Sequence, residues 1–299
     1  MTTKEASAGS SLIVRAPLGG VLMGLANLVP GISGGTMLLA TGVYTQFVEA
    51  IAEVTTLRFR ARSLALLAMI GLAALATIVL LAGPIKGLVV DYRWVMYAIF
   101  IGLTFGGIPV VRRMLGGFTP RVFLGLVMGA VIMVGLAVMN WAGIGGASSS
   151  GTGLLFVAGL LGASAMVLPG ISGAYMLLIL GQYEPILDAL HALKGGEVSG
   201  TLAVVAPVGI GVVAGIVGVS NLIRWALVRH EDLTLGFLLG LLIGSVVGIF
   251  PFQRPIEVDS TLMEVYAPTV GQAAAAVGLA VVGFGLTALI DRMGGQSTT

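Results

Sequence analysis

Apolar runs dominate the chain, and short segments that hold most of its charges separate them. Six of these runs approach the ~20 residues that a helix needs to cross the hydrocarbon core of a bilayer. They are continuous, whereas the strands of a membrane β-barrel would alternate apolar and polar residues over ~10 positions. The pattern predicts six spanning helices, over residues 63–83, 92–111, 120–141, 200–223, 234–250 and 270–290. The expected fold class is therefore an all-α integral membrane protein, a polytopic helical bundle.

Composition adds that this bundle is tightly packed. Of the 299 residues, 57% are hydrophobic and 9% are charged, whereas soluble domains carry about 25% charged residues. The chain has 46 glycines, and small residues let membrane helices approach each other closely. Pairs of glycines four residues apart occur at Gly102 and Gly106, at Gly125 and Gly129, and at Gly240 and Gly244. We expect these glycines to pack helices and assign them no chemistry.

The residues that metal and thiol chemistry require are scarce. There is no cysteine, which excludes a disulfide framework, a thiolate nucleophile and a thiolate metal site. The two histidines, His191 and His230, are far apart and have no partners at metal-ligand spacing. We therefore expect no metal, no cofactor and no nucleic-acid partner.

An internal repeat divides the chain into two related halves. Residues 28–44 and residues 167–183 share ten identities in seventeen positions at an offset of 139. Three predicted spans follow each copy, and an odd number of crossings places the second half upside down relative to the first. This arrangement is the inverted repeat of many transporters. We expect each half to contain one re-entrant helical hairpin and three spans.

The distribution of Lys and Arg predicts how this topology is oriented in the membrane. Under it, one face receives eleven of the fifteen Lys and Arg residues, and cytoplasmic loops carry the excess of these residues. The distribution predicts that both termini lie in the cytoplasm. The expected organisation is a disordered tail over residues 1–12, a first inverted repeat over 13–142, a linker over 143–153 and a second inverted repeat over 154–292.

Each repeat begins with a PGISG motif that interrupts an apolar run. Proline removes a backbone donor and clashes with the preceding turn, so the helix must break at Pro30 and at Pro169. Ser33 and Ser172 are residue types that cap the start of a following helix. The free N–H groups of a helix start bind phosphate or carboxylate. A simple kink in two packed helices is the alternative, but matching interruptions in both halves favour an anion site.

Charged residues near the spans supply further candidates. Glu49 and Asp188 recur at corresponding places in the two halves, and an acidic group in a membrane segment often belongs to a proton relay. Both also lie near helix ends, where they could simply reach interfacial water. Arg112, Arg113 and Arg224 lie on the predicted cytoplasmic side, where they set topology or attract a lipid phosphate.

Several motifs resemble those of the bacterial polyprenyl-phosphate transporter family, over nearly the whole chain. They are NLVPGISGGT at 27–36, GxY at 42–44, the stretch at 102–109 and GLLIGSVVGIFPF at 240–252. The resemblance implies a flippase that returns undecaprenyl phosphate, the lipid carrier of cell-wall precursors, from the outer to the inner leaflet of the cytoplasmic membrane. The phosphate-binding residues that it implies are Pro30, Gly31, Ser33, Gly34, Gly35, Thr36, Pro169, Gly170, Ser172 and Gly173. The second copy departs from the pattern at Ala174 and Tyr175.

Two other functions are compatible with the sequence. A transporter of a small soluble anion would use the same helix ends without a lipid tail. A membrane enzyme acting on lipid phosphates would need a base, a nucleophile or a metal cluster, and the spans supply no histidine and no acid cluster. The expected partners are a polyprenyl-phosphate lipid and the bilayer itself, and the sequence leaves a homo-oligomer open.

Overall fold

The computed structural model describes residues 3–28, 32–141, 151–194, 198–255 and 263–295. Six of its helices are long and apolar enough to cross a membrane, and they confirm the six predicted spans to within a few residues. They are α4 (Ala61–Asp91), α5 (Arg93–Met114), α6 (Pro120–Trp141), α10 (Val198–Arg229), α11 (Glu231–Gly248) and α12 (Val270–Gly295). The expected architecture of a multi-pass membrane protein is thus present.

Three further helices precede the long ones in each half. In the first half they are α1 (Thr3–Leu28), α2 (Gly34–Ala40) and α3 (Tyr44–Thr55). In the second half they are α7 (Thr152–Val167), α8 (Gly173–Ile179) and α9 (Tyr183–Lys194). The helix α1 therefore includes residues that we expected in a tail. The two halves share one element order, in which a broken helix and a short third helix precede three long helices.

One short β-hairpin departs from the expected all-α fold. Strand β1 (Gln253–Pro255) pairs antiparallel with β2 (Met263–Val265) in the connection between α11 and α12. An ion pair between Arg254 and Glu264 joins the two strands. Three-residue strands lack the longer alternation of apolar and polar residues that predicts a strand.

Helices α5 and α11 are the most buried of the six long helices, whereas the other four are mostly exposed at the surface of the bundle. The outer helices expose large apolar side chains, including Leu80 on α4 (73%), Val131 on α6 (63%), Ile210 on α10 (64%) and Val277 on α12 (66%). Such extended apolar surface marks a membrane-facing protein. The bundle is therefore surrounded by lipid and has an interior built around two central helices.

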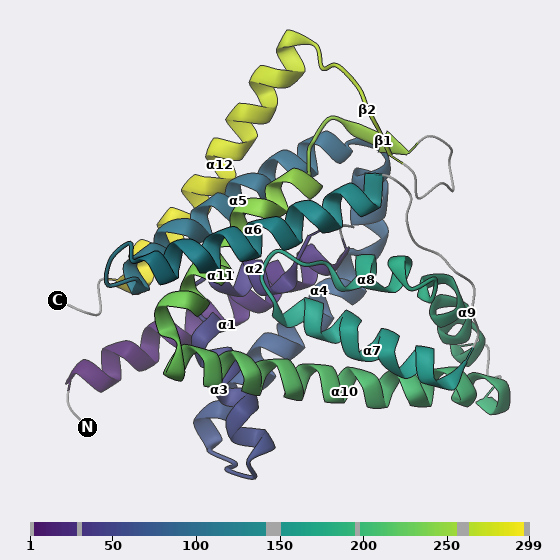
Figure 1. Cartoon of the computed structure of the whole chain (residues 1–299), viewed down its shortest axis with the longest axis horizontal. Helices are drawn as coiled ribbons and strands as arrows, with labels where there is room; N and C mark the ends of the chain where they lie inside the picture. Colours follow the sequence, from purple (N-terminus) through teal and green to yellow (C-terminus); the bar gives the residue numbers. More distant parts are fainter. Residues whose placement is uncertain (1–2, 29–31, 142–150, 195–197, 256–262, 296–299) are drawn as a thin grey trace.

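Glycines bring pairs of helices into close contact, as we expected. Helix α5 packs along α12, where Gly102 contacts Ala280 and Gly106 contacts Thr287. Helix α6 packs along α11, where Gly125 contacts Leu233 and Gly129 contacts Phe237. In both pairs the residue numbers rise together, so the paired helices run in the same direction. Figure 1 shows α12 lying alongside α5.

The broken helices pair with the first long helix of their own half. Helix α1 packs along α4, where Gly20 contacts Ile70 and Gly24 contacts Ala74. Helix α7 packs along α10, with Gly211 on Phe156 and Gly215 on Leu160. These pairs are also parallel. The chain therefore returns, between α1 and α4 and again between α7 and α10, to the side from which it started.

A leucine in place of Gly240 is expected to destabilise the bundle. Any Cβ at this position on α11 would press on the backbone of Leu126 and Ala130 in α6, and overpacking of this kind costs about 1–3 kcal/mol or more. Thermal unfolding in detergent should show a lower midpoint for Gly240→Leu. Gly218→Leu is the matched control, because nothing lies within 4 Å of a Cβ there. Equal midpoints for the two variants would contradict the packing role.

Candidate functional site

The two PGISG motifs occupy the breaks between α1 and α2 and between α7 and α8. Pro30 and Gly31 lie outside the described residues. In the second motif α7 ends at Val167, just before Pro169, since the residue preceding a proline disfavours the helical conformation. Gly170 then adopts a φ of +89°, and a Cβ there would lie 2.6 Å from the carbonyl oxygen of Leu241 on α11. Only glycine fits this position.

The structure brings the two motifs into direct contact. Ser33 Oγ donates a hydrogen bond of 2.8 Å to the Leu168 carbonyl, and the Gly170 N–H donates one of 2.7 Å to Thr36 Oγ1. Both hydroxyl-bearing residues are buried. Gly35 allows this approach, because a Cβ there would lie 2.5 Å from the Val167 carbonyl oxygen. Hydroxyl groups of the first motif thus satisfy backbone groups of the second.

This contact corrects one prediction about Ser33. The residue stands at the N-cap of α2, but its side chain makes no capping hydrogen bond to that helix. Its hydroxyl instead bonds across the break to the other half. The hydroxyl is directed at a carbonyl of the second motif, 135 residues away in the sequence, and sequence proximity does not reveal that partner.

The turns that follow α2 and α8 explain the GxY sequence after each motif. Gly42 has a φ of +66° and Gly181 one of +64°. At the first turn, the N–H of Val43 donates to Leu38 O and that of Gly42 to Leu39 O, which is the Schellman arrangement that ends a helix at glycine. The chain can then begin α3 at Tyr44.

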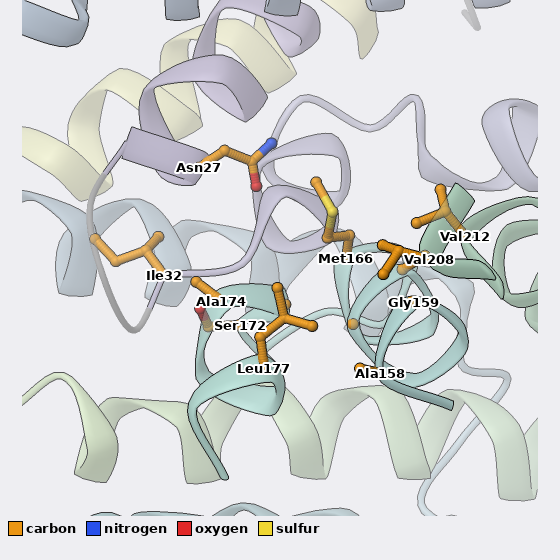
Figure 2. A pocket seen from close by; sticks show the side chains of 13 residues that line it. Asn27, Ile32, Ala158, Gly159, Met166, Ser172, Ala174, Leu177, Val208 and Val212 are labelled. Carbon is orange, nitrogen blue, oxygen red and sulfur yellow. The ribbon is translucent and has the colours of Figure 1, made fainter. Parts of the chain in front are cut away.

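A cavity of about 230 Å³ lies beside the meeting point of the two motifs (Figure 2). It is lined from both halves, by the end of α1, Ile32, α7, the start of α8 and one side of α10. Ser172 and Gly173 of the second motif are among its lining residues. Most of the lining is apolar and includes Met166, Val208 and Val212. The cavity therefore offers a few polar groups within an apolar wall.

The other glycines of the motifs are packing residues here. A Cβ on Gly34 would lie 2.8 Å from Met23 Cγ, and one on Gly173 2.7 Å from Met166 Cγ. Gly173 therefore both lines the cavity and allows α8 to lie against α7. Helix α2 is buried along its whole length, whereas the described residues of α8 are half-buried. Helix α8 is thus the more accessible of these two short helices.

The predicted charged candidates lie away from this cavity. Arg112 and Arg113 are exposed at the end of α5, and Arg113 Nε donates to the Pro109 carbonyl of its own helix. Asp188 is exposed on α9. Glu49 and Arg224 are also exposed, but the structure brings them together, because both line a separate cavity of about 330 Å³ between α3 and α10.

Sequence reasoning missed two residues of this region. Asn27, at the end of α1, directs its amide toward the cavity in Figure 2. Arg15 donates from Nε to the Thr41 carbonyl at 2.7 Å and so binds the end of α2. Asn27 is the only strongly polar side chain in the last turns of α1, and its position just before the motif was the signal available.

Six apolar helices, two helix breaks that meet in the interior and a cavity beside them define an integral membrane transporter. The chain belongs to the undecaprenyl phosphate translocase-like family, whose model matches residues 23–265. This result confirms the resemblance seen in the motifs. The family is one of transporters and not of enzymes.

Two relatives are both described as polyprenyl-phosphate transporters. The chain is 29% identical over 253 residues to a polyprenyl-phosphate transporter of Vibrio cholerae, a match covering 80% of this chain and 78% of the relative. It is 31% identical over 242 residues to a polyprenyl-phosphate transporter of Staphylococcus aureus, covering 78% of this chain and 85% of the relative. No solved structure matches the chain.

Proposed function

We propose that the protein carries a polyprenyl phosphate, such as undecaprenyl phosphate, from the outer to the inner leaflet of the cytoplasmic membrane for reuse in cell-wall synthesis. The contact between the two PGISG motifs beside a cavity lined from both halves is the observation that carries this proposal. A site shared by two halves can change its access when the halves rock against each other. The choice of a polyprenyl phosphate as the substrate rests on the names of the two relatives.

The directions of the helices support an inverted repeat. Helix α5 lies parallel to α12 and α6 lies parallel to α11. Residues 115–119 form a short connection between α5 and α6, so these two crossings run in opposite directions. Helix α11, the repeat counterpart of α5, then runs opposite to α5. The second half is accordingly upside down in the bilayer relative to the first.

The contacts within each broken helix support re-entrant hairpins. Along α1 and α2 the residue numbers run in opposite senses, since Gly34 lies near Met23 and Thr41 lies near Gly19. The same holds for α7 and α8, where Leu177 lies near Gly162. Each broken helix enters the bundle, turns at its motif and comes back. In this proposal both termini lie in the cytoplasm, which the excess of Lys and Arg on one face supports.

The lipid phosphate occupies the 230 Å³ cavity in this proposal. Ser172 and Asn27 offer hydrogen bonds there, and the backbone of Gly173 is close. A cavity of this size is large enough for a phosphate group and a few carbon atoms. The rest of a polyprenyl chain must leave the cavity and lie in the bilayer.

The cavity wall favours a lipid over a small soluble anion. Val208 and Val212 of α10 line the cavity, while Ile210 and Val213 of the same helix are 64% and 63% exposed. An isoprenoid tail leaving past α10 would therefore meet apolar surface that already faces lipid. A soluble anion would gain nothing from this wall.

Leaflet distribution of polyprenyl phosphate in proteoliposomes tests the proposal. Ser33→Leu and Ser172→Leu should each slow translocation by about tenfold or more, since each places an apolar side chain where a buried polar group is needed. Thr152→Leu, at an exposed position on α7, is the control and should retain the normal rate. Normal translocation by both serine variants would remove the motifs from the mechanism.

A matched soluble ligand separates the two transport functions. Inorganic phosphate should neither cross these vesicles nor slow the lipid when it is present at similar concentration. Phosphate uptake that depends on Ser172 would instead assign the cavity to a soluble anion.

A further inference from the structure

The described residues that line the cavity at the motifs carry no charge that could neutralise a phosphate. Among the described residues that line it, the polar side chains are Asn27 and Ser172, and both are neutral. In the sequence, residues 29–31 are Val, Pro and Gly and carry no titratable group. Figure 2 shows Asn27 and Ser172 facing an otherwise apolar set of side chains.

The titratable groups on α1, α8 and α10, which line this cavity, either bond to groups outside it or lie far along the helix from it. On α1, Arg15 is bonded to Thr41 at the far end of α2. On α8, the hydroxyl of Tyr175 donates to the Leu136 carbonyl of α6. Helix α7 has no titratable residue, and Arg224 and Arg229 lie near the end of α10. The acidic candidates Glu49 and Asp188 do not line the cavity.

In water near neutral pH, a phosphate monoester exists as a mixture of the monoanion and the dianion, because its second pKa is about 6. Transfer of an ion out of water costs free energy that grows with the square of its charge, so the dianion is penalised far more than the monoanion. Desolvation without a compensating cation therefore favours the protonated form. An apolar, uncharged cavity selects the monoanion on these grounds.

The hydrogen-bonding groups of the cavity also favour the monoanion. A phosphate dianion can only accept hydrogen bonds, whereas the monoanion also has one P–OH donor. Asn27 offers both an N–H₂ donor and a carbonyl acceptor, and Ser172 offers a hydroxyl that does either. The carbonyl of Asn27 can accept from the P–OH, while a dianion would leave that acceptor facing negative oxygen atoms.

Resting on the proposed function, we infer that the cavity binds its lipid phosphate as the singly protonated monoanion, so that the substrate itself carries the proton. On the outer side ROPO₃²⁻ takes up one H⁺ to become ROPO₃H⁻, and on the inner side the same proton leaves the phosphate oxygen. One proton crosses with each lipid. An acidic exterior then drives the lipid inward with no proton-carrying side chain.

A ligand series tests which group holds the proton. The full-length protein in nanodiscs is titrated between acidic and alkaline pH with four ligands of the same short isoprenyl chain. They are the phosphate, the phosphonate with its higher second pKa, the difluorophosphonate with its lower one and the sulfate ester, which is a monoanion throughout. The pH of half-maximal binding should follow the ligand, with about a tenfold loss of affinity per pH unit above each ligand's second pKa. The sulfate ester should bind equally at every pH.

Protein variants complete the test. Glu49→Gln and Asp188→Asn should leave each ligand's midpoint unchanged, because neither carboxyl group lines the cavity. One midpoint shared by all four ligands, or a midpoint moved by either variant, would overturn the inference and assign the proton to the protein. Binding that never depends on pH for the three phosphorus ligands would also overturn it while leaving the proposed function intact. If none of the four ligands binds, the proposed function fails as well.

Discussion

Replacing Gly35 with leucine is expected to slow transport severely while the protein still inserts in the membrane. A Cβ at this position would lie 2.5 Å from the carbonyl oxygen of Val167 and 3.1 Å from the carbonyl carbon of Leu168. Those neighbours are backbone atoms of the opposite motif, so they cannot rotate away. The two motifs must separate, which breaks the bonds from Ser33 to Leu168 and from Gly170 to Thr36.

The size of this effect follows from the groups left without partners. Each buried donor or acceptor that loses its hydrogen bond costs about 1–3 kcal/mol, so we expect translocation to fall by about a hundredfold. Proteoliposome assays of polyprenyl phosphate movement measure the loss. Gly71→Leu controls for the added side chain, because nothing lies within 4 Å of a Cβ at that exposed position. A Gly35→Leu variant that transports as fast as Gly71→Leu would show that motif contact is dispensable.

Filling the cavity should also slow transport, but without lowering the stability of the protein. Ala163 is a buried lining residue, 3% exposed, and Ala163→Phe would place a ring in the 230 Å³ space. The hydrogen bonds between the motifs do not involve this position. Filling a void commonly stabilises a protein by about 0.5–2 kcal/mol, so thermal unfolding should occur at an equal or higher temperature.

Transport by Ala163→Phe should nevertheless fall by about tenfold or more, because the ring excludes the phosphate from the uncharged cavity that we assign to it. Thermal unfolding and lipid translocation are measured on the same preparation. Val213→Phe, on the lipid-facing side of α10, adds the same ring outside the cavity and should leave both unchanged. Full transport by the Ala163 variant would place the lipid elsewhere.

Hydropathy was sufficient to predict the spans, and the four-residue spacing of glycines was sufficient to predict where helices pack closely. A run of apolar residues has one stable solution in a bilayer, a helix with its backbone bonds made internally, and Gly102, Gly129 and Gly240 pack against neighbouring helices as expected. The strand pair at Gln253 and Met263 was not predicted, because three-residue strands form only when they pair with each other, and that pairing leaves no pattern in the sequence of either strand. The start of α1 at Thr3 also differs from the expected tail.

The candidate site was predictable as a pair of motifs and not as a geometry. Repetition of PGISG identified the segments that meet, because matching helix breaks in the two halves of a transporter commonly form its binding site at the interface between the repeats. It could not say that Ser33 and Thr36 would bond to Leu168 and Gly170, more than 130 residues away. Asn27 escaped notice because its role depends on a cavity whose other walls come from α7, α8 and α10.

Membrane insertion, duplication and family follow from the order of residues alone, since each rests on local hydrophobicity or on matches between segments. Which groups face one another, by contrast, is decided by the tertiary structure. The partners of the motif hydroxyls, the absence of charge among the described residues around the cavity and the distance of Glu49 and Asp188 from it arise from packing between the halves. Contacts between residues remote in the chain depend on how whole helices lie together, and no short stretch of sequence encodes that arrangement by itself.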